Sequence, residues 1–384
     1  MTRSSAELYE AALERLPGGN TRTTVYTAPA PPYAVRGSGF TVVDADGHEL
    51  IDLQGNMTAL VHGHAHPEIV AAVCEAMAGG SCFGLPTAAE VAHADCLVSR
   101  IESAQRVRFA NSGTEAVMLA LRIARAFTGR PKILRFARSY HGTYDAVCDD
   151  GARGVAPAVW ETVVTVALGD EQAVRKALDE YGDDLACVLV DLMPNRPGLV
   201  PATEEFAGFL REETAARGIL LVVDEVITYR LAMGGLHSLY GLAPDLVALG
   251  KTIGGGLPVG AVAGRADVLG VTDPRQPGAV ELGGTFTANP LTTAAGMAAM
   301  RLLDADAVER INGLGDALRA ALIERGFRVN GRGSLLRVLA DDPLDLWWRL
   351  YRSGLLVAGN GLACISTPMD ESTIDEILRR WPDA

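Results

Sequence analysis

Two residues whose side chains could do chemistry follow short apolar runs in the middle of the chain. Asp224 ends the run at residues 219–223, and Lys251 follows the run at 246–250. Such Val- and Leu-rich runs are typical of fully buried parallel strands, and ligands of open α/β sheets bind beyond the carboxyl ends of strands. A lysine there, followed by the flexible residues 252–256, suits a buried amine of lowered pKa that attacks a carbonyl. The aspartate suits a fixed anion that faces a cationic ring nitrogen.

The pattern alone leaves a second interpretation open, in which Asp224 and Lys251 are unrelated loop residues at strand ends. The residues around Asp224 and Lys251 favour the first interpretation. The segments D-E-V-I-T (224–228) and G-K-T-I-G-G-G (250–256) resemble the core of the class III, fold type I, pyridoxal-phosphate aminotransferases. The resemblance extends from Pro17 to about Asn330. It implies that Lys251 carries pyridoxal 5'-phosphate as a Schiff base, the internal aldimine, and that Asp224 keeps the cofactor's ring nitrogen protonated.

The expected architecture is an α/β protein. Repeated βα units with buried strands indicate a mostly parallel sheet wrapped by helices. The resemblance implies the pyridoxal-phosphate transferase fold type I, with a large domain around that sheet and a small α+β domain built from both chain ends. We expect residues 1–50 to form an N-terminal segment of the small domain and an active-site loop, 51–290 the large cofactor-binding domain, and 291–384 the C-terminal small domain.

Composition restricts the partners. The chain has 384 residues, enough for one large domain and a smaller one, and a net charge of −13. With no basic run, this charge argues against nucleic acid or an anionic membrane as a partner. The first 16 residues carry charges throughout, unlike a signal peptide, and the six cysteines show no C-x-x-C spacing. These features predict a cytoplasmic protein with reduced thiols.

The segment 111–116, N-S-G-T-E-A, is predicted to join a short strand to a long helix. Ser112 and Glu115 have the spacing of a capping box, and a helix start with a glycine and two hydroxyls can bind an anion. An ordinary capped helix is the alternative. Because the family uses this segment for the cofactor phosphate, the resemblance assigns Ser112, Gly113 and Thr114 to that role.

The cofactor ring is expected to lie between two side chains. In the family an aromatic residue before a His-Gly pair stacks on the pyridine ring, and here Tyr140 precedes His141 and Gly142. The resemblance therefore places Tyr140 on one face, with His141 among the cofactor-binding residues, and Val226 on the other face. The alternative for Tyr140 is a core aromatic.

A second glycine-containing turn, G-T-F-T-A-N-P at 284–290, matches a family turn whose threonine reaches the phosphate of the neighbouring subunit. If Thr285 does so, each active site is shared. The resemblance thus implies an obligate homodimer.

Arg22 follows the loop P-G-G-N-T at 17–21. A loop arginine is usually a solvated charge, but its planar fork also suits a substrate carboxylate. In the related glutamate-1-semialdehyde aminomutases and β-amino-acid aminotransferases, an arginine after a similar loop holds that carboxylate, which makes Arg22 the candidate for substrate binding.

The alternating histidines 62, 64 and 66 could hold a metal ion, but no acidic or cysteine partners stand nearby in the sequence. We therefore predict no metal site. The segment G-H-A-H-P at 63–67 matches a structural turn of the family near its active site.

Two departures from the family pattern affect the expected contacts. The usual E-P-x-x-G is replaced by D-L-M-P-N at 191–195, so the contact to the ring hydroxyl is open, and Asn195 or Arg196 could supply it. The turn 358–361 lacks the arginine that binds a second carboxylate in β-phenylalanine-type aminotransferases.

The expected activity is transfer of the amino group of a β-amino acid, or a similar carboxylated amine, to a keto acid through pyridoxamine phosphate. The segments 228–232 and 273–275 look closer to the β-amino-acid aminotransferases than to the aminomutases. Two alternatives stay open. One is a glutamate-1-semialdehyde-type 2,1-aminomutase, and the other is a protein that binds pyridoxal phosphate without turnover.

Overall fold

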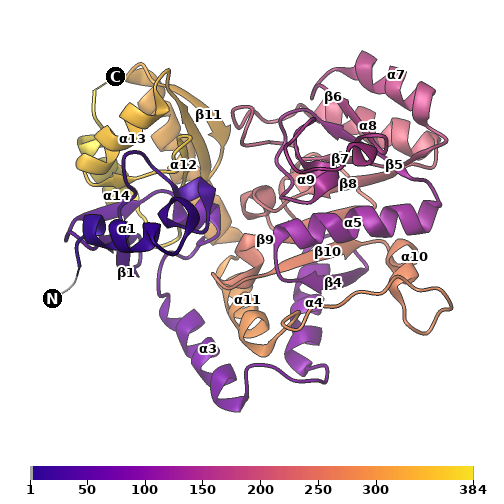
Figure 1. Cartoon of the computed structure of the whole chain (residues 1–384), viewed down its shortest axis with the longest axis horizontal. Coiled ribbons are helices and arrows are strands. Elements are labelled where there is room, and N and C mark those ends of the chain that lie inside the picture. Colours follow the sequence, from indigo (N-terminus) through magenta and orange to yellow (C-terminus); the bar gives the residue numbers. More distant parts are fainter. Residues whose placement is uncertain (1–2, 384) are drawn as a thin grey trace. The chain divides into compact units, whose positions relative to one another are not determined.

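The computed structural model describes residues 3–383 and divides the chain into two compact units (Figure 1). The large unit comprises residues 68–308. The small unit combines the chain up to Pro67 with residues 309–384. The expected small domain built from both chain ends is therefore present.

A seven-stranded sheet forms the centre of the large unit. Its order is β4-β10-β9-β8-β7-β5-β6, and every neighbouring pair is parallel except the two made by β10. The central strands are buried along their whole length, which explains their continuous apolar sequences. The strands are β4 Arg106–Ala110, β5 Lys132–Phe136, β6 Val163–Val166, β7 Leu185–Val190, β8 Leu220–Asp224, β9 Leu246–Gly250 and β10 Gly260–Gly264.

Helices surround this sheet, and α5 (Gly113–Thr128) packs along it against β9 and β10 (Figure 1). The side chain of Ser112 caps the start of α5, and Gly129 ends it in the left-handed conformation. The other helices are α3 Pro67–Gly79, α4 Ala88–Arg100, α6 Pro157–Trp160, α7 Glu171–Tyr181, α8 Glu204–Ala216, α9 Leu236–Leu239, α10 Ala266–Leu269 and α11 Pro290–Leu302. Short 3-10 turns are η3 Asp145–Val147, η4 Thr228–Leu231, η5 Lys251–Gly254 and η6 Gly270–Thr272.

The small unit contains two sheets, of order β1-β2-β3-β13 and β11-β12-β14. Strand β13 pairs in parallel with β3, so the two ends of the chain share one sheet. The strands are β1 Ala34–Ser38, β2 Thr41–Asp44, β3 Glu49–Asp52, β11 Arg328–Arg332, β12 Leu335–Leu339, β13 Leu355–Leu356 and β14 Leu362–Cys364. The helical elements are α1 Ser5–Leu13, η1 Pro17–Gly19, η2 Thr23–Val25, α2 Gly55–Thr58, α12 Ala305–Glu324, α13 Pro343–Arg352 and α14 Glu371–Arg380, and α12 begins in the large unit.

The chain passes from one unit to the other after residues 67 and 308, whereas the boundaries were expected after residues 50 and 290. Residues 51 and 52 pair with β13, which keeps the following segment in the small unit. Helix α11 packs against α4 and η5, which keeps residues 291–308 in the large unit. Strands β2 and β3 form an antiparallel hairpin in which Val43 pairs with Glu49.

Within residues 3–383, no helix is both long enough and apolar enough to span a membrane.

Candidate active site

The carboxyl ends of three neighbouring parallel strands bring two acids and an amine together. Val190 of β7 pairs with Val223 of β8, so Asp191 and Asp224 leave adjacent strands at the same edge. Asp224 in turn lies opposite Ala248 of β9, and β9 leads directly into Lys251. The expectation that Asp224 and Lys251 stand at the ends of buried parallel strands is confirmed.

Lys251 is held in an unusual backbone conformation, with a φ of 48°. This left-handed region is unfavourable for residues other than glycine, and such strain concentrates at functional sites. Burial lowers the pKa of the Lys251 amine, and the carboxyl groups of Asp224 and Asp191 oppose that shift. The neutral amine is therefore more populated at a given pH than for an exposed lysine, as a nucleophilic lysine requires.

The carboxylate of Asp224 is buried and oriented by two donors. Its Oδ1 accepts the N–H of Val226 at 3.0 Å, and its Oδ2 lies 2.7 Å from Nδ1 of His141. Within residues 3–383, Nε2 of His141 is buried and has no hydrogen-bond partner. Each carboxylate oxygen can accept two hydrogen bonds, so Asp224 retains capacity for a further donor such as a protonated ring nitrogen.

The start of α5 lies beside this edge. Ser112 Oγ accepts the N–H of Glu115 at 3.1 Å, while Glu115 Oε2 accepts the N–H of Asn111 at 2.7 Å. The glutamate thus bonds one residue before the position that a capping box predicts. The first N–H groups of α5 have no backbone partner within the helix, and those that Ser112 does not cap can, together with the helix dipole, bind an anion.

Glycines bring these segments close together. A Cβ on Gly113 would lie 2.8 Å from Cγ1 of Val226, and one on Gly250 would lie 3.3 Å from the Cα of Gly113. A Cβ on Gly142, whose φ is 100°, would lie 2.8 Å from the Cα of Thr114. Hence the helix start, the β9 end and Val226 surround one location, and a side chain at Gly113 would overlap Val226.

The side chain of Tyr140 is partly exposed. Its side chain is 40% exposed, whereas the flanking Ser139 and His141 are buried. The core alternative for Tyr140 is therefore excluded. The guanidinium of Arg196 lies 4.5 Å from the centre of this ring and is paired with Asp149 at 3.0 Å.

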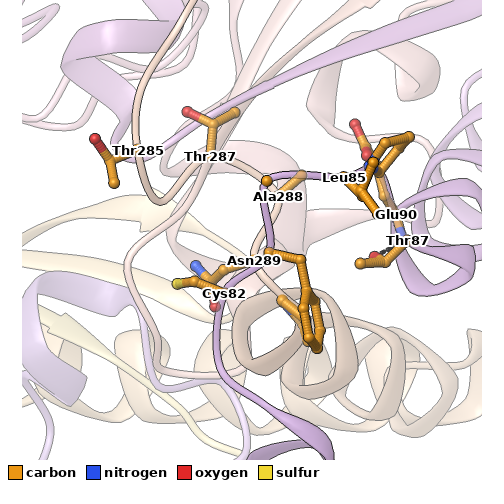
Figure 2. Close-up of a pocket in the computed structure, with 12 residues that line it drawn as sticks. Cys82, Leu85, Thr87, Glu90, Thr285, Thr287, Ala288 and Asn289 are labelled. Atoms are coloured by element: carbon orange, nitrogen blue, oxygen red, sulfur yellow. Dashed lines mark hydrogen bonds between the residues drawn. The ribbon is translucent and has the colours of Figure 1, made fainter.

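Thr285 is exposed and lines a surface cavity of about 280 Å³ together with residues 82–87 and Glu90. Figure 2 shows Thr285 and Thr287 on one side of it and Leu85, Thr87 and Glu90 on the other. Large apolar side chains beside it are strongly exposed, with Phe83 at 55% and Leu85 at 76%. Thr287 also accepts a hydrogen bond from Asn111 Nδ2 at 3.1 Å, next to the start of α5.

Arg22 belongs to the small unit, where its Nη1 donates to Oδ1 of Asn56 at 2.7 Å. It lines a cavity of about 280 Å³ whose other walls are largely apolar and aromatic, among them Val25, Trp347 and Leu356. No local sequence pattern indicates this cavity, because its walls come from both ends of the chain.

Two of the three alternating histidines at 62, 64 and 66 make side-chain hydrogen bonds. Nδ1 of His62 lies 2.9 Å from Thr367 Oγ1, and Nε2 of His64 lies 2.7 Å from Oδ2 of Asp52. These contacts agree with the structural turn that the sequence indicated.

The sheet order, with an amine and a carboxylate leaving neighbouring parallel strands, belongs to a fold type I pyridoxal-phosphate enzyme, as comparison with known proteins shows. A family model for the class III aminotransferases matches residues 25–368. A glutamate-1-semialdehyde 2,1-aminomutase of Methanothermobacter thermautotrophicus is 38% identical over 350 residues, covering 87% of this chain and 83% of that protein.

Solved structures that are similar to this chain include aminotransferases. An omega-transaminase from Sphaerobacter thermophilus is 42% identical, with a TM-score of 0.95 over 98% of this chain and 96% of that one. A β-phenylalanine aminotransferase from Variovorax paradoxus is 36% identical, with a TM-score of 0.92 over 98% of this chain and 92% of that one. The chain belongs to the class III aminotransferases, which are pyridoxal-phosphate-dependent enzymes acting on an amino donor and a keto acid acceptor.

The residues at the strand ends fit this cofactor. The unpartnered Nε2 of His141, the glycine-lined approach at Gly113 and the lowered pKa of the Lys251 amine all occur at the same edge of the sheet. An anion site at the start of α5 suits the phosphate.

Proposed function

We propose that this enzyme transfers the amino group of a β-amino acid to a keto acid acceptor. The observation that carries the chemistry is Lys251, with its lowered pKa, beside Asp224 at the carboxyl edge of the sheet. The observation that points to the substrate is that Arg22 lines a largely apolar cavity.

When bound, pyridoxal phosphate supplies an electron sink for the electrons left at the substrate carbon. Lys251 would hold the cofactor through its amine and would move a proton to and from the reacting carbon of the substrate. Asp224 would keep a proton on the ring nitrogen, and His141, whose Nδ1 lies 2.7 Å from Oδ2 of Asp224, orients that carboxylate. Ser112, Gly113 and Thr114 would bind the phosphate, and Tyr140 and Val226 would contact the ring.

Arg22 and its cavity support a carboxylated amine with an apolar substituent. A guanidinium binds a carboxylate through parallel hydrogen bonds. The cavity beside Arg22 is lined by Val25, Trp347 and Leu356, which suit an alkyl or aryl group. The similarity to a β-phenylalanine aminotransferase supports the same substrate class.

The enzyme is proposed to work as a homodimer in which Thr285 reaches the phosphate site of the partner subunit. Support comes from the exposure of Thr285 and from the exposed apolar side chains Phe83, Leu85 and Phe286 beside it. Exposed large apolar side chains gathered around one cavity mark an interaction site.

All six cysteines are free, which supports a location in the reducing environment of the cytoplasm.

The second candidate is an intramolecular 2,1-aminomutase, supported by the names of several relatives at 33–39% identity. A mutase must retain the amino form of the cofactor, whereas a transaminase must release its keto product. The third candidate, binding of the cofactor without turnover, rests on the replacement at 191–195.

A half-reaction tests the proposal. The enzyme loaded with pyridoxal phosphate is mixed with a β-amino acid and no acceptor, and its visible absorption band is followed while products are assayed. Conversion to pyridoxamine phosphate with one equivalent of β-keto acid supports the transaminase. An isomer formed from an amino-aldehyde without an acceptor would establish the mutase, and bound cofactor that exchanges with no amine would establish the third candidate.

A further inference from the structure

A strained turn in the small unit holds Arg22. The acceptor of the Arg22 hydrogen bond, Asn56, stands in the segment Gly55–Thr58. Three successive residues there, Asn56, Met57 and Thr58, have φ values of 48°, 57° and 74°. L-residues adopt this region singly and rarely, so a run of three persists only where surrounding contacts impose it.

Hydrogen bonds through Asp52 connect this turn to His64. The buried carboxylate of Asp52 accepts the N–H groups of Gln54 and Gly55 through Oδ1, at 2.8 and 2.9 Å. Its Oδ2 lies 2.7 Å from Nε2 of His64. The backbone of His64 is itself fixed, because it exchanges two hydrogen bonds with Gly39 at 2.7 and 2.9 Å. His64 thus orients Asp52, and Asp52 starts the left-handed turn.

We infer that Asn56 is a positioning residue for Arg22 and that the His64–Asp52 pair is its support. The inference rests on the proposed role of Arg22 as the substrate carboxylate clamp. Asn56 occupies one donor of the guanidinium and leaves the remaining donors of the fork for a carboxylate. Because the amide is neutral, it restricts the orientation of Arg22 without cancelling the charge that binds the substrate.

Asn56→Gly tests the contact without endangering the fold. Glycine accepts the left-handed conformation readily, so the variant removes the amide while relieving strain. We expect KM for a β-amino acid to rise roughly two- to ten-fold, the range for one lost hydrogen bond, with kcat largely retained. Calorimetric binding of the matching carboxylic acid without an amino group should weaken by a similar factor, whereas its uncharged primary amide should bind as it does to the wild type.

Asn56→Asp provides a contrast of nearly equal size. Its carboxylate would pair with Arg22 and compete with the substrate, so KM should rise further than in Asn56→Gly. In the His64–Asp52 pair, His64→Leu removes the partner of Asp52 and should also raise KM for the carboxylated substrate. His64→Gln keeps a donor for Asp52, so its KM should rise less than that of His64→Leu.

The same measurements on Arg22→Ala distinguish the proposed binding of the carboxylate by Arg22 from the positioning of Arg22 by Asn56. If Arg22→Ala discriminates between the acid and the amide but Asn56→Gly weakens both ligands equally or neither, Asn56 does not position Arg22. An effect of Asn56→Gly that persists in full on top of Arg22→Ala would also overturn the inference, since Asn56 would then act independently. If Arg22→Ala itself affects acid and amide alike, the proposed clamp is wrong and the inference falls with it.

Discussion

Nδ1 of His141 and Oδ2 of Asp224 lie 2.7 Å apart, and both side chains are buried. The contact joins the loop after β5 to the end of β8, so it fixes the acid relative to the loop that carries Tyr140. A buried carboxylate that loses a partner keeps its full desolvation penalty, which makes this contact sensitive to substitution.

His141→Leu should therefore weaken the site without abolishing it. Removal of one partner from a buried carboxylate costs about 1–3 kcal/mol, so we expect a loss of roughly five- to 150-fold in kcat/KM. His141→Gln, which can still donate to Asp224, should lose less. Steady-state kinetics check the order, and equal losses in the two variants would show that the ring packs but does not orient Asp224.

Arg196 is predicted to stabilise the ring of Tyr140. The guanidinium lies 4.5 Å from the ring centre, and a partly exposed cation–π contact contributes about 0.5–1 kcal/mol. Arg196→Gln should raise the dissociation constant of pyridoxal phosphate roughly two- to five-fold, because the ring is held less firmly. Equilibrium titration of the cofactor-free protein measures this constant.

Asp149→Asn is the matched control for this prediction. It removes the exposed ion pair at 3.0 Å but leaves the arginine and the ring in place. Exposed pairs contribute little, so the cofactor should dissociate as it does from the wild type. A larger effect of Asp149→Asn than of Arg196→Gln would contradict a role for the stack.

The elements that position Asp224 and Lys251 were predictable because their signals are local. Strands β8 and β9 are continuous apolar runs, and α5 begins at a capping serine. Strand β10 carries no such signal, because its sequence G-A-V-A-G lacks bulky residues. Its small size has a packing reason, because a Cβ on Gly260 would overlap the backbone of Ser112.

The contacts around the site were less predictable, because their partners are distant in the sequence. Nothing local indicates that Arg22 meets Asn56, 34 residues away, or that Asn56 is left-handed. Sequence reasoning left Asn195 and Arg196 as alternatives for the ring-hydroxyl contact. In the structure Arg196 is paired with Asp149 and lies over Tyr140, while Asn195 is buried after β7, and that contact stays a prediction.

Asp191 should make the stability of the cofactor-free protein depend on pH. Burial, followed by the nearby charge of Asp224, raises the pKa of Asp191 well above its ordinary 3.8. Above pH 3.8 the unfolded chain releases this proton while the folded chain keeps it, so the free energy of unfolding falls as the pH rises toward the folded pKa. In Asp191→Asn the side chain at this position does not titrate, and its amide oxygen can still accept the N–H of Met193.

The stability of Asp191→Asn relative to the wild type should therefore increase from pH 4 to pH 8. Denaturant unfolding at the two pH values measures the difference, with the exposed Asp183→Asn as a control that should change little. A relative stability that does not depend on pH, or that decreases as the pH rises, would contradict the raised pKa of Asp191.

Subunits with different defects should complement each other if Thr285 acts across the dimer. Lys251→Ala and Thr285→Ala subunits, each strongly impaired alone, form one intact site in every mixed dimer. Random reassociation should thus restore about a quarter of the wild-type activity. Thr287→Ala is the control, because Thr287 bonds Asn111 of its own chain at 3.1 Å, so any loss that it causes should persist after mixing with Lys251→Ala. Mixed dimers that form without recovering activity would show that Thr285 does not serve the partner's site.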